Sequence, residues 1–163
     1  MTFSQHADNV SLGAYTGRIS VDELKDLSID GTILNHSERK IPLKYLEEII
    51  ARCKKKRLLT VVCASSLSEV KKICRFKPDY LAYEPKELIG GDVSVTKARP
   101  EIIAEAVELV KKISRKTKVL CGAGVHSKED VRQALLLGAK GVLIGHAVPK
   151  AGNPQEFLRK MLV

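Results

Sequence analysis

Short apolar runs of four or five residues alternate along the whole chain with longer amphipathic stretches. Turn residues bound each apolar run, as is typical of buried parallel strands. The pattern predicts strands over Thr2–His6, Gly31–Leu34, Thr60–Cys63, Tyr80–Tyr83, Lys118–Cys121 and Gly141–Ile144. It predicts helices over Val21–Leu27, Leu43–Lys56, Ser66–Phe76, Pro100–Ser114, Ser127–Leu137 and Pro154–Val163.

Several predicted helices begin with capping chemistry. Ser66 and Glu69 have the spacing of a capping box, in which each side chain accepts a hydrogen bond from a free backbone N–H of the first turn. Ser127 and Asp130 repeat that arrangement, and Asn153 precedes a first-turn proline. These signals support the predicted starts of three helices.

Six successive strand–helix alternations indicate a parallel sheet covered by helices. Two closures fit this order, an open doubly wound sheet or part of an eight-stranded barrel. The chain has 163 residues, which is short of a full barrel by roughly two strand–helix units. The residue pattern alone leaves both closures open.

Composition places the chain among ordinary globular proteins, with 44% hydrophobic and 29% charged residues. No apolar run is long enough to span a bilayer, and the first residues lack the pattern of a secretory signal. We therefore expect a cytoplasmic protein with reduced thiols, since no two cysteines form a Cys-x-x-Cys pair. No group of residues has metal-ligand spacing, so we expect no metal. The cysteines are Cys53, Cys63, Cys74 and Cys121.

The net charge of +9 raises the question of a nucleic-acid partner. The basic residues fall in short clusters toward the ends of predicted helices, where the helix dipole favours cations and the side chains face water. Aromatic residues make up only 4% of the chain, so there is little to stack on bases. We expect solvated helix ends and neither a nucleic-acid nor a membrane partner.

Polar and glycine residues follow the predicted strands. In parallel α/β folds the active site lies at the carboxyl ends of the strands. Glycine-bearing turns there let the backbone approach a phosphate and donate N–H groups to it. The segments in question are Asn35–Arg39, Glu84–Asp92, Gly122–Gly124 and Gly145–Ala147.

Glu84 and His36 are the candidate base and electrophile of such a site. Taken alone, Glu84 is more typical of a solvated or salt-bridged loop carboxylate. His36 equally suits a capping position at the start of a helix. The residue types therefore suggest proton-transfer chemistry without establishing it.

Taken together, these segments resemble the triosephosphate isomerase family, and its short archaeal form in particular. Asn35–Arg39 resembles the family's Asn-His-Ser-Glu-Arg signature, and Ala82–Pro85 its segment with the catalytic glutamate. Val119–Gly124, Gly141–Ile144 and Ser4–Asp8 resemble further strands and loops in the same order. The resemblance implies an incomplete TIM (β/α)8 barrel, with six parallel βα units corresponding to strands 3–8 in a single domain over residues 1–163.

The resemblance also implies roles for individual residues. Glu84 would be the base that moves a proton between two carbons of a triose phosphate, His36 would polarise the substrate oxygens, and Glu38 would be a supporting carboxylate. The loop Pro85–Thr96 would close over the substrate, and no cofactor is expected. The phosphate would bind at Gly90, Gly122, Ala123, Gly124, Gly145 and His146.

Three departures from the family pattern stand out. Gly90–Asp92 brings a carboxylate close to an anion site, and His146 stands where a small residue is usual. The family's first two βα units, which carry an Asn-x-Lys segment, have no match in this sequence. We expect a homo-oligomer or a complementing N-terminal fragment to cover the exposed strand edges. The alternative is an inactive partial barrel that binds a phosphorylated ligand or a protein partner.

Overall fold

The structure is a computed structural model and describes residues 1–85 and 95–163. Within these ranges five parallel strands form one sheet, and they lie side by side in sequence order. Parallel neighbours need crossover connections, which the helices supply. The strands are β1 (Phe3–Ser4), β2 (Gly31–Leu34), β3 (Leu59–Ala64), β4 (Tyr80–Tyr83) and β5 (Lys118–Cys121).

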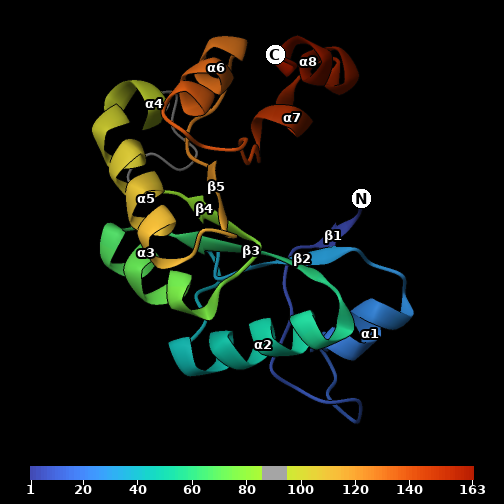
Figure 1. Cartoon of the computed structure of the whole chain (residues 1–163). Helices are drawn as coiled ribbons and strands as arrows, with labels where there is room; N and C mark the ends of the chain where they lie inside the picture. Colours follow the sequence, from blue (N-terminus) through green and yellow to red (C-terminus); the bar gives the residue numbers. More distant parts are fainter. Residues whose placement is uncertain (86–94) are drawn as a thin grey trace.

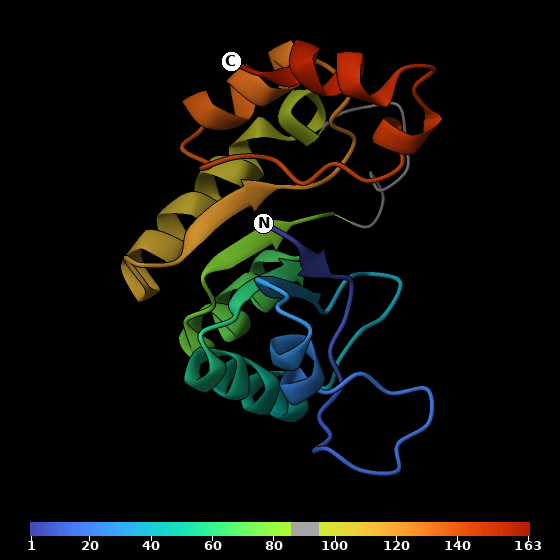
Figure 2. The ribbon, with the colours of Figure 1, turned by 90° about the vertical axis from the view of Figure 1, so that its right-hand side faces the viewer.

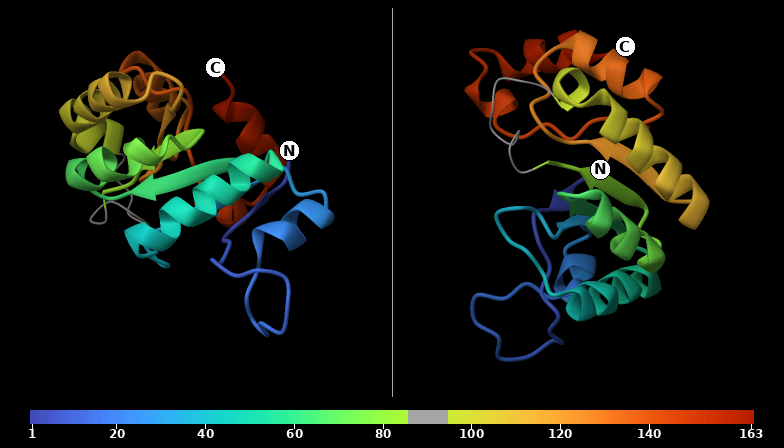
Figure 3. Two further views of the ribbon diagram at one scale, coloured as in Figure 1. Left: turned by 60° about the horizontal axis from the view of Figure 1, so that its bottom comes forward. Right: turned by 90° about the vertical axis from the view of Figure 1, so that its left-hand side faces the viewer.

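The helices are arranged as an open ring around the sheet. Figure 1 shows α1 and α2 below the strands, α3 and α5 beside them, and α6 to α8 above, with the N-terminus at the opening. Figure 2 shows the loop between β1 and α1 extending away from the body, and Figure 3 shows α2 running along the sheet. The helices are α1 (Val21–Asp26), α2 (Leu43–Lys56), α3 (Leu67–Ile73), the 3₁₀ turn η1 (Cys74–Phe76), α4 (Val95–Ala98), α5 (Pro100–Ile113), α6 (Lys128–Leu136), α7 (Ala147–Lys150) and α8 (Pro154–Met161).

The strand that the apolar pattern predicted over Gly141–Ile144 is not confirmed. Val142 forms only an isolated parallel bridge with Cys121. The Cys121 N–H donates to the Gly141 carbonyl at 3.1 Å, and the Leu143 N–H donates to the Cys121 carbonyl at 2.9 Å. Cys121 is the last residue of β5, and no further bridge joins the two segments in the described part of the chain.

The predicted first strand is shortened to two residues. The hydroxyl of Ser4 donates to the His6 carbonyl at 3.0 Å and to the Thr32 hydroxyl at 2.8 Å. The second bond joins Ser4 to its partner in β2, and the backbone pairing of the two strands ends at this position. β2, β4 and β5 have the predicted bounds, and β3 is one residue longer at each end.

The predicted helix starts are mostly correct, with one difference in capping. The Ser127–Asp130 box and the Asn153 cap are present. The Ser66 side chain accepts a hydrogen bond from the Glu69 N–H, as the capping box predicts. The Glu69 carboxylate, however, accepts from the N–H of Ser65 at 2.8 Å and not from that of Ser66. The second hydrogen bond of the box is therefore displaced by one residue. The helices α4 and α7 were not predicted, because four residues are too short for a helical period to be recognised.

The sheet has apolar residues on both faces. The outer face packs against the helices in the main core, which includes Leu34, Val62 and Leu81. The inner face forms a smaller cluster of Val61, Cys63 and Ala82, with partly buried apolar neighbours. Burial on both faces explains why the strands read as continuous apolar runs.

The basic clusters lie where the charge pattern predicted. Lysines occupy the last turns of α2, α3 and α5, while Arg115 and Lys116 lie just beyond α5. None of the helices among the described residues is long and apolar enough to cross a membrane. The positive charge therefore sits mainly at helix ends that favour cations.

Asp8 connects the β1–α1 loop to the loop after β2. Its carboxylate accepts hydrogen bonds from the Ile19 N–H at 2.9 Å, Arg18 at 2.9 Å and Arg39 at 3.2 Å, and it contacts the His6 ring at 3.2 Å. Burial raises the pKa of Asp8, but these hydrogen bonds outweigh it and lower the pKa from 3.8 to about 2.

Replacing Asp8 by asparagine is expected to lower the free energy of unfolding at neutral pH by about 2 kcal/mol. Because the folded pKa lies below the unfolded value, this stabilisation is present above about pH 4 and is lost as the pH falls toward about 2. Urea unfolding of both proteins between neutral and acid pH measures the difference. An exposed carboxylate, Asp26→Asn, is the control, and equal stability of Asp8→Asn and the parent at pH 7 would contradict the prediction.

Candidate functional site

A cavity of about 850 Å³ opens at the carboxyl ends of the strands. Its walls come from the loops after β1, β2, β4 and β5 and from the segment that leads into α7. The polar groups that converge on it include Glu84, His36 and the glycines of the two late turns. The lining residues used below are His6, His36, Glu38, Arg39, Glu84, Gly122, Gly124, His126, Gly145, His146 and Lys150.

Glu84 is held rigidly in the cavity wall. Its N–H donates to the Ala64 carbonyl at 2.8 Å, which continues the β3–β4 ladder by one residue. The residue is only 4% exposed, which excludes a solvated loop carboxylate. Its Oε2 is buried and has no hydrogen-bond partner among the described residues. A buried carboxylate oxygen without a partner is poised to accept a proton from a bound molecule.

The electrostatic surroundings of Glu84 suit a base. Burial raises the pKa of its carboxyl group above the ordinary value. The neighbouring Cys63 thiol and the His36 imidazole act in the opposite direction, and burial prevails. A raised pKa brings a carboxylate closer to the range in which it accepts and returns a proton readily.

His36 is presented by a loop that Asn35 fixes in place. Asn35 has a φ of +59°, a left-handed conformation that asparagine tolerates better than most residues. Its buried side chain donates to the Cys63 carbonyl at 2.8 Å and accepts from the Ile41 N–H at 3.0 Å. The loop that carries His36 is thereby attached to the end of β3.

The His36 ring lies between Glu38 and Glu84. The backbone N–H of Glu38 donates to His36 Nδ1 at 3.4 Å, which favours the neutral tautomer with its proton on Nε2. That Nε2 is 3.7 Å from Glu84 Oε2. The Glu38 carboxylate is 85% exposed and lies 3.4 Å from Nδ1. A hydrogen-bond donor and a proton acceptor therefore face each other inside one cavity.

The predicted phosphate residues divide into three groups. Gly122, Gly124 and Gly145 line the cavity together with His146. Ala123 does not line it, because its side chain packs in the main core. Gly90 lies outside the described residues, as does most of the predicted closing loop. Gly124 has a φ of +63°, which few residues other than glycine adopt.

Gly122 leaves the space that Glu84 occupies. Its N–H donates to the Tyr83 carbonyl at 3.1 Å, and a Cβ built on it would lie 2.6 Å from both Glu84 Cγ and Oε1. Contacts this short force the carboxylate side chain to move. The absence of a side chain at this turn therefore positions Glu84 and also opens the backbone to the cavity.

Replacing Gly122 by alanine is expected to lower the catalytic rate proposed below by about 10- to 100-fold, because it displaces the carboxylate of Glu84. The fold is expected to survive, since the clash is with a side chain. Steady-state kinetics and circular dichroism measure the two effects. Gly152→Ala is the matched control, since no atom lies within 4 Å of a Cβ there; equal rates for both variants would contradict the positional role of Gly122.

Several residues around the cavity were not singled out for the site by the sequence pattern. Asn35 and Cys63 support His36 and Glu84, while His126, Lys150 and His6 line the cavity. Asn35 stands at the start of the candidate segment Asn35–Arg39, but the sequence pattern assigned it no role of its own. For the others no sequence signal exists, since their proximity depends on how the loops converge.

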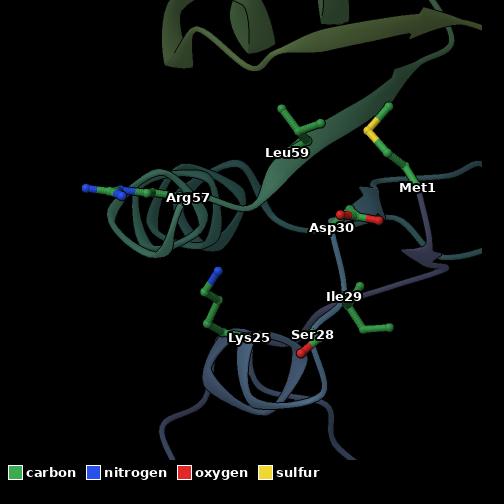
Figure 4. A pocket seen from close by; sticks show the side chains of 7 residues that line it. All are labelled: Met1, Lys25, Ser28, Ile29, Asp30, Arg57 and Leu59. Carbon is green, nitrogen blue, oxygen red and sulfur yellow. The ribbon is translucent and has the colours of Figure 1, made fainter.

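A second cavity of about 340 Å³ lies at the opposite ends of the strands. Figure 4 shows Lys25, Arg57 and Asp30 around it. The Asp30 carboxylate already accepts a hydrogen bond from the Thr2 N–H at 2.6 Å. Among the described residues that line this cavity, no buried polar atom lacks a hydrogen-bond partner, and no base faces a proton donor as Glu84 faces His36. Among the described residues no cluster of histidine, cysteine or carboxylate side chains could hold a metal ion.

Comparison with known proteins gives a consistent result. Residues 1–161 match the family described as triosephosphate isomerase. The triosephosphate isomerase of Methanocaldococcus jannaschii is 43% identical over 160 residues, which cover 98% of this chain and 73% of that protein. The triosephosphate isomerase of Thermoplasma volcanium is 42% identical over 163 residues, and the match covers 98% of this chain and 74% of that protein. The triosephosphate isomerase of Methanobrevibacter smithii is 40% identical over 156 residues, and the match covers 96% of this chain and 70% of that protein.

Proposed function

Because the chain belongs to the triosephosphate isomerase family, we propose that it interconverts dihydroxyacetone phosphate and glyceraldehyde 3-phosphate. The observation that carries the proposal is the pairing of Glu84 with His36 across the cavity, at 3.7 Å between Oε2 and Nε2. The two groups come from loops after different strands and meet only in the folded chain. Their chemistry is that of a base and a hydrogen-bond donor.

In the proposed reaction Glu84 removes a proton from the carbon beside the substrate carbonyl. The electron pair of the broken C–H bond forms a carbon–carbon double bond, and the carbonyl oxygen takes up negative charge as an enediolate. The His36 Nε2–H stabilises that oxygen and passes its proton to it, and the imidazole takes up the proton of the neighbouring hydroxyl, which becomes the new carbonyl. The protonated Glu84 then returns its proton to the former carbonyl carbon. Glu38 would support the reaction through its backbone N–H, which donates to Nδ1 of His36, while its predicted role as a supporting carboxylate stays a proposal.

We assign the substrate phosphate to the glycine turns that line the cavity. Gly124 and Gly145 line the cavity, where their backbone N–H groups can bind an anion, and His146 lies beside them. Gly122 would contribute the space that its missing side chain leaves, since its N–H already donates to the Tyr83 carbonyl. Ala123 would contribute only its backbone. Gly90 and the loop Pro85–Thr96 remain predicted contributors, and a closing loop there would exclude water from the enediolate.

The proposed architecture is a partial barrel of six βα units in one domain, with Gly141–Ile144 as the sixth strand position. Within the described residues β1 forms one outer edge of the sheet. We propose that self-association or a complementing N-terminal fragment covers this edge and supplies the positive charge that the family places beside the substrate. We further propose that the protein acts in the cytoplasm.

An isomerase assay on the purified chain, with light scattering on the same sample, tests the proposal. We expect turnover of triose phosphate by a particle larger than the 18.0 kDa chain, or turnover that appears when the complementing fragment is added. Full turnover by a monomer would contradict the proposal that self-association or a complementing fragment is needed to complete the site. Binding of a phosphate ligand without turnover in either form would favour the inactive partial barrel instead.

A further inference from the structure

All four histidines of the chain line the proposed active-site cavity. They are His6, His36, His126 and His146. The proposed mechanism uses His36, and His6 contacts the Asp8 carboxylate. The rings of the remaining two contact each other edge to face, with centroids 5.4 Å apart and planes inclined by 66°.

His126 and His146, the imidazole pair, belong to the two late turns. His126 follows Gly124 by two residues, and His146 comes directly after Gly145. Both side chains are partly exposed and line the same cavity as the glycines. The pair therefore lies beside the backbone groups that we assign to the phosphate.

We propose that the two side chains of the imidazole pair bind the phosphate group of the ligand, and that the pair takes up a proton when the anion binds. The inference rests on the proposed function, because it takes the ligand to be a phosphate ester. On this proposal the affinity of the phosphate site for an anion depends on the charge of the two imidazoles. Affinity would then rise as the solution becomes more acidic.

The physical reason is mutual repulsion within the pair. Histidine changes its charge between about pH 5 and pH 8. Two imidazolium rings in contact repel each other, so the empty pair resists holding two protons at once. A tetrahedral dianion beside both rings compensates the two positive charges and favours the second protonation. By linkage, the anion promotes proton binding as much as the proton promotes anion binding.

Charged groups surround the pair. The Asp130 carboxylate accepts from the His126 backbone N–H at 3.1 Å. Lys150, which lines the cavity four residues beyond His146, adds positive charge that favours an anion. Within residues 1–85 and 95–163, the other titratable or charged groups that line this cavity are Glu84, Glu38, Arg39, His6 and His36.

Calorimetric titration with sulfate tests the proposal, because sulfate keeps both negative charges throughout this pH range. Measurements in the Glu84→Gln background remove the buried carboxylate as a competing titrating group. We expect sulfate affinity to be about tenfold higher at about pH 6 than at about pH 8. We also expect the heat of binding to depend on the ionisation enthalpy of the buffer, since protons are taken up.

The variants His126→Gln and His146→Gln should each reduce the pH dependence and the proton uptake, and the double variant should remove most of both. His6→Gln is the matched control, being a histidine of the same cavity outside the pair, and should keep them. Both rings of the pair are partly exposed, so we expect these variants to fold, and circular dichroism checks this.

An unchanged pH dependence in the double variant would overturn the proposal for the imidazole pair and leave the proposed isomerase function standing. Absence of sulfate binding at both pH values would also overturn it, and with it the assignment of the phosphate site. Loss of the pH dependence in the double variant, with no Glu84-dependent turnover in the parent chain, would support the pair and count against the proposed function.

Discussion

Replacing Glu84 by glutamine is expected to lower kcat for triose phosphate isomerisation by about 10³-fold while leaving KM nearly unchanged. Glutamine has nearly the same shape as glutamate but cannot accept the proton from carbon. The side chain is buried and its Oε2 has no hydrogen-bond partner among the described residues, so the main loss is of the proton acceptor. Steady-state kinetics on the assembled protein measure both constants.

The control for this substitution is Glu47→Gln, which removes an exposed carboxylate from α2. It should leave both constants unchanged. The Glu84→Gln variant should still bind sulfate, because the proposed phosphate contacts are made by the glycine turns and not by the Glu84 carboxylate. Turnover within a few fold of the parent value would show that another group is the base.

Replacing His36 by glutamine is expected to lower kcat by about 10²-fold. The imidazole Nε2–H faces the cavity because the Glu38 N–H bonds to Nδ1 and because Asn35 anchors the loop. A glutamine amide cannot present a donor at the same point with the same support. The negative charge that develops on the substrate oxygen then loses its fixed hydrogen bond.

Comparison with the double variant Glu84→Gln/His36→Gln shows whether the two groups act as a unit. If they do, the double variant loses little more activity than Glu84→Gln alone, because the donor has no developing charge to stabilise. Rate losses that multiply would contradict joint action. A His36→Gln protein with parent activity would remove this residue from the proposed mechanism.

The sequence predicted the sheet well because the strands are buried on both faces. Tyr80–Tyr83 and Lys118–Cys121 read as short apolar runs, and the structure places both strands at those bounds. The capped starts of α6 and α8 were likewise readable, since a cap depends on neighbours within three residues. Local chemistry therefore accounts for most of the secondary structure.

The arrangement around the site depends on contacts between distant segments, which no local pattern reveals. Glu84 looked like a solvated carboxylate from its neighbours in sequence, but its burial comes from packing against loops far along the chain. The contact of His126 with His146 joins two turns twenty residues apart. The strand that the apolar pattern predicted over Gly141–Ile144 forms only a single bridge, because strand pairing depends on contacts with distant segments and not on the local pattern alone.

Hydrogen exchange at the carbon-bound positions of dihydroxyacetone phosphate, followed by NMR in D₂O, tests the central claim most directly. It reports proton removal by the base without requiring the complete isomerisation. The account predicts that the assembled protein replaces substrate hydrogen by deuterium, and that Glu84→Gln does so at least about a hundredfold more slowly. Exchange at equal rates in both proteins, or no exchange while the substrate is bound, would contradict it.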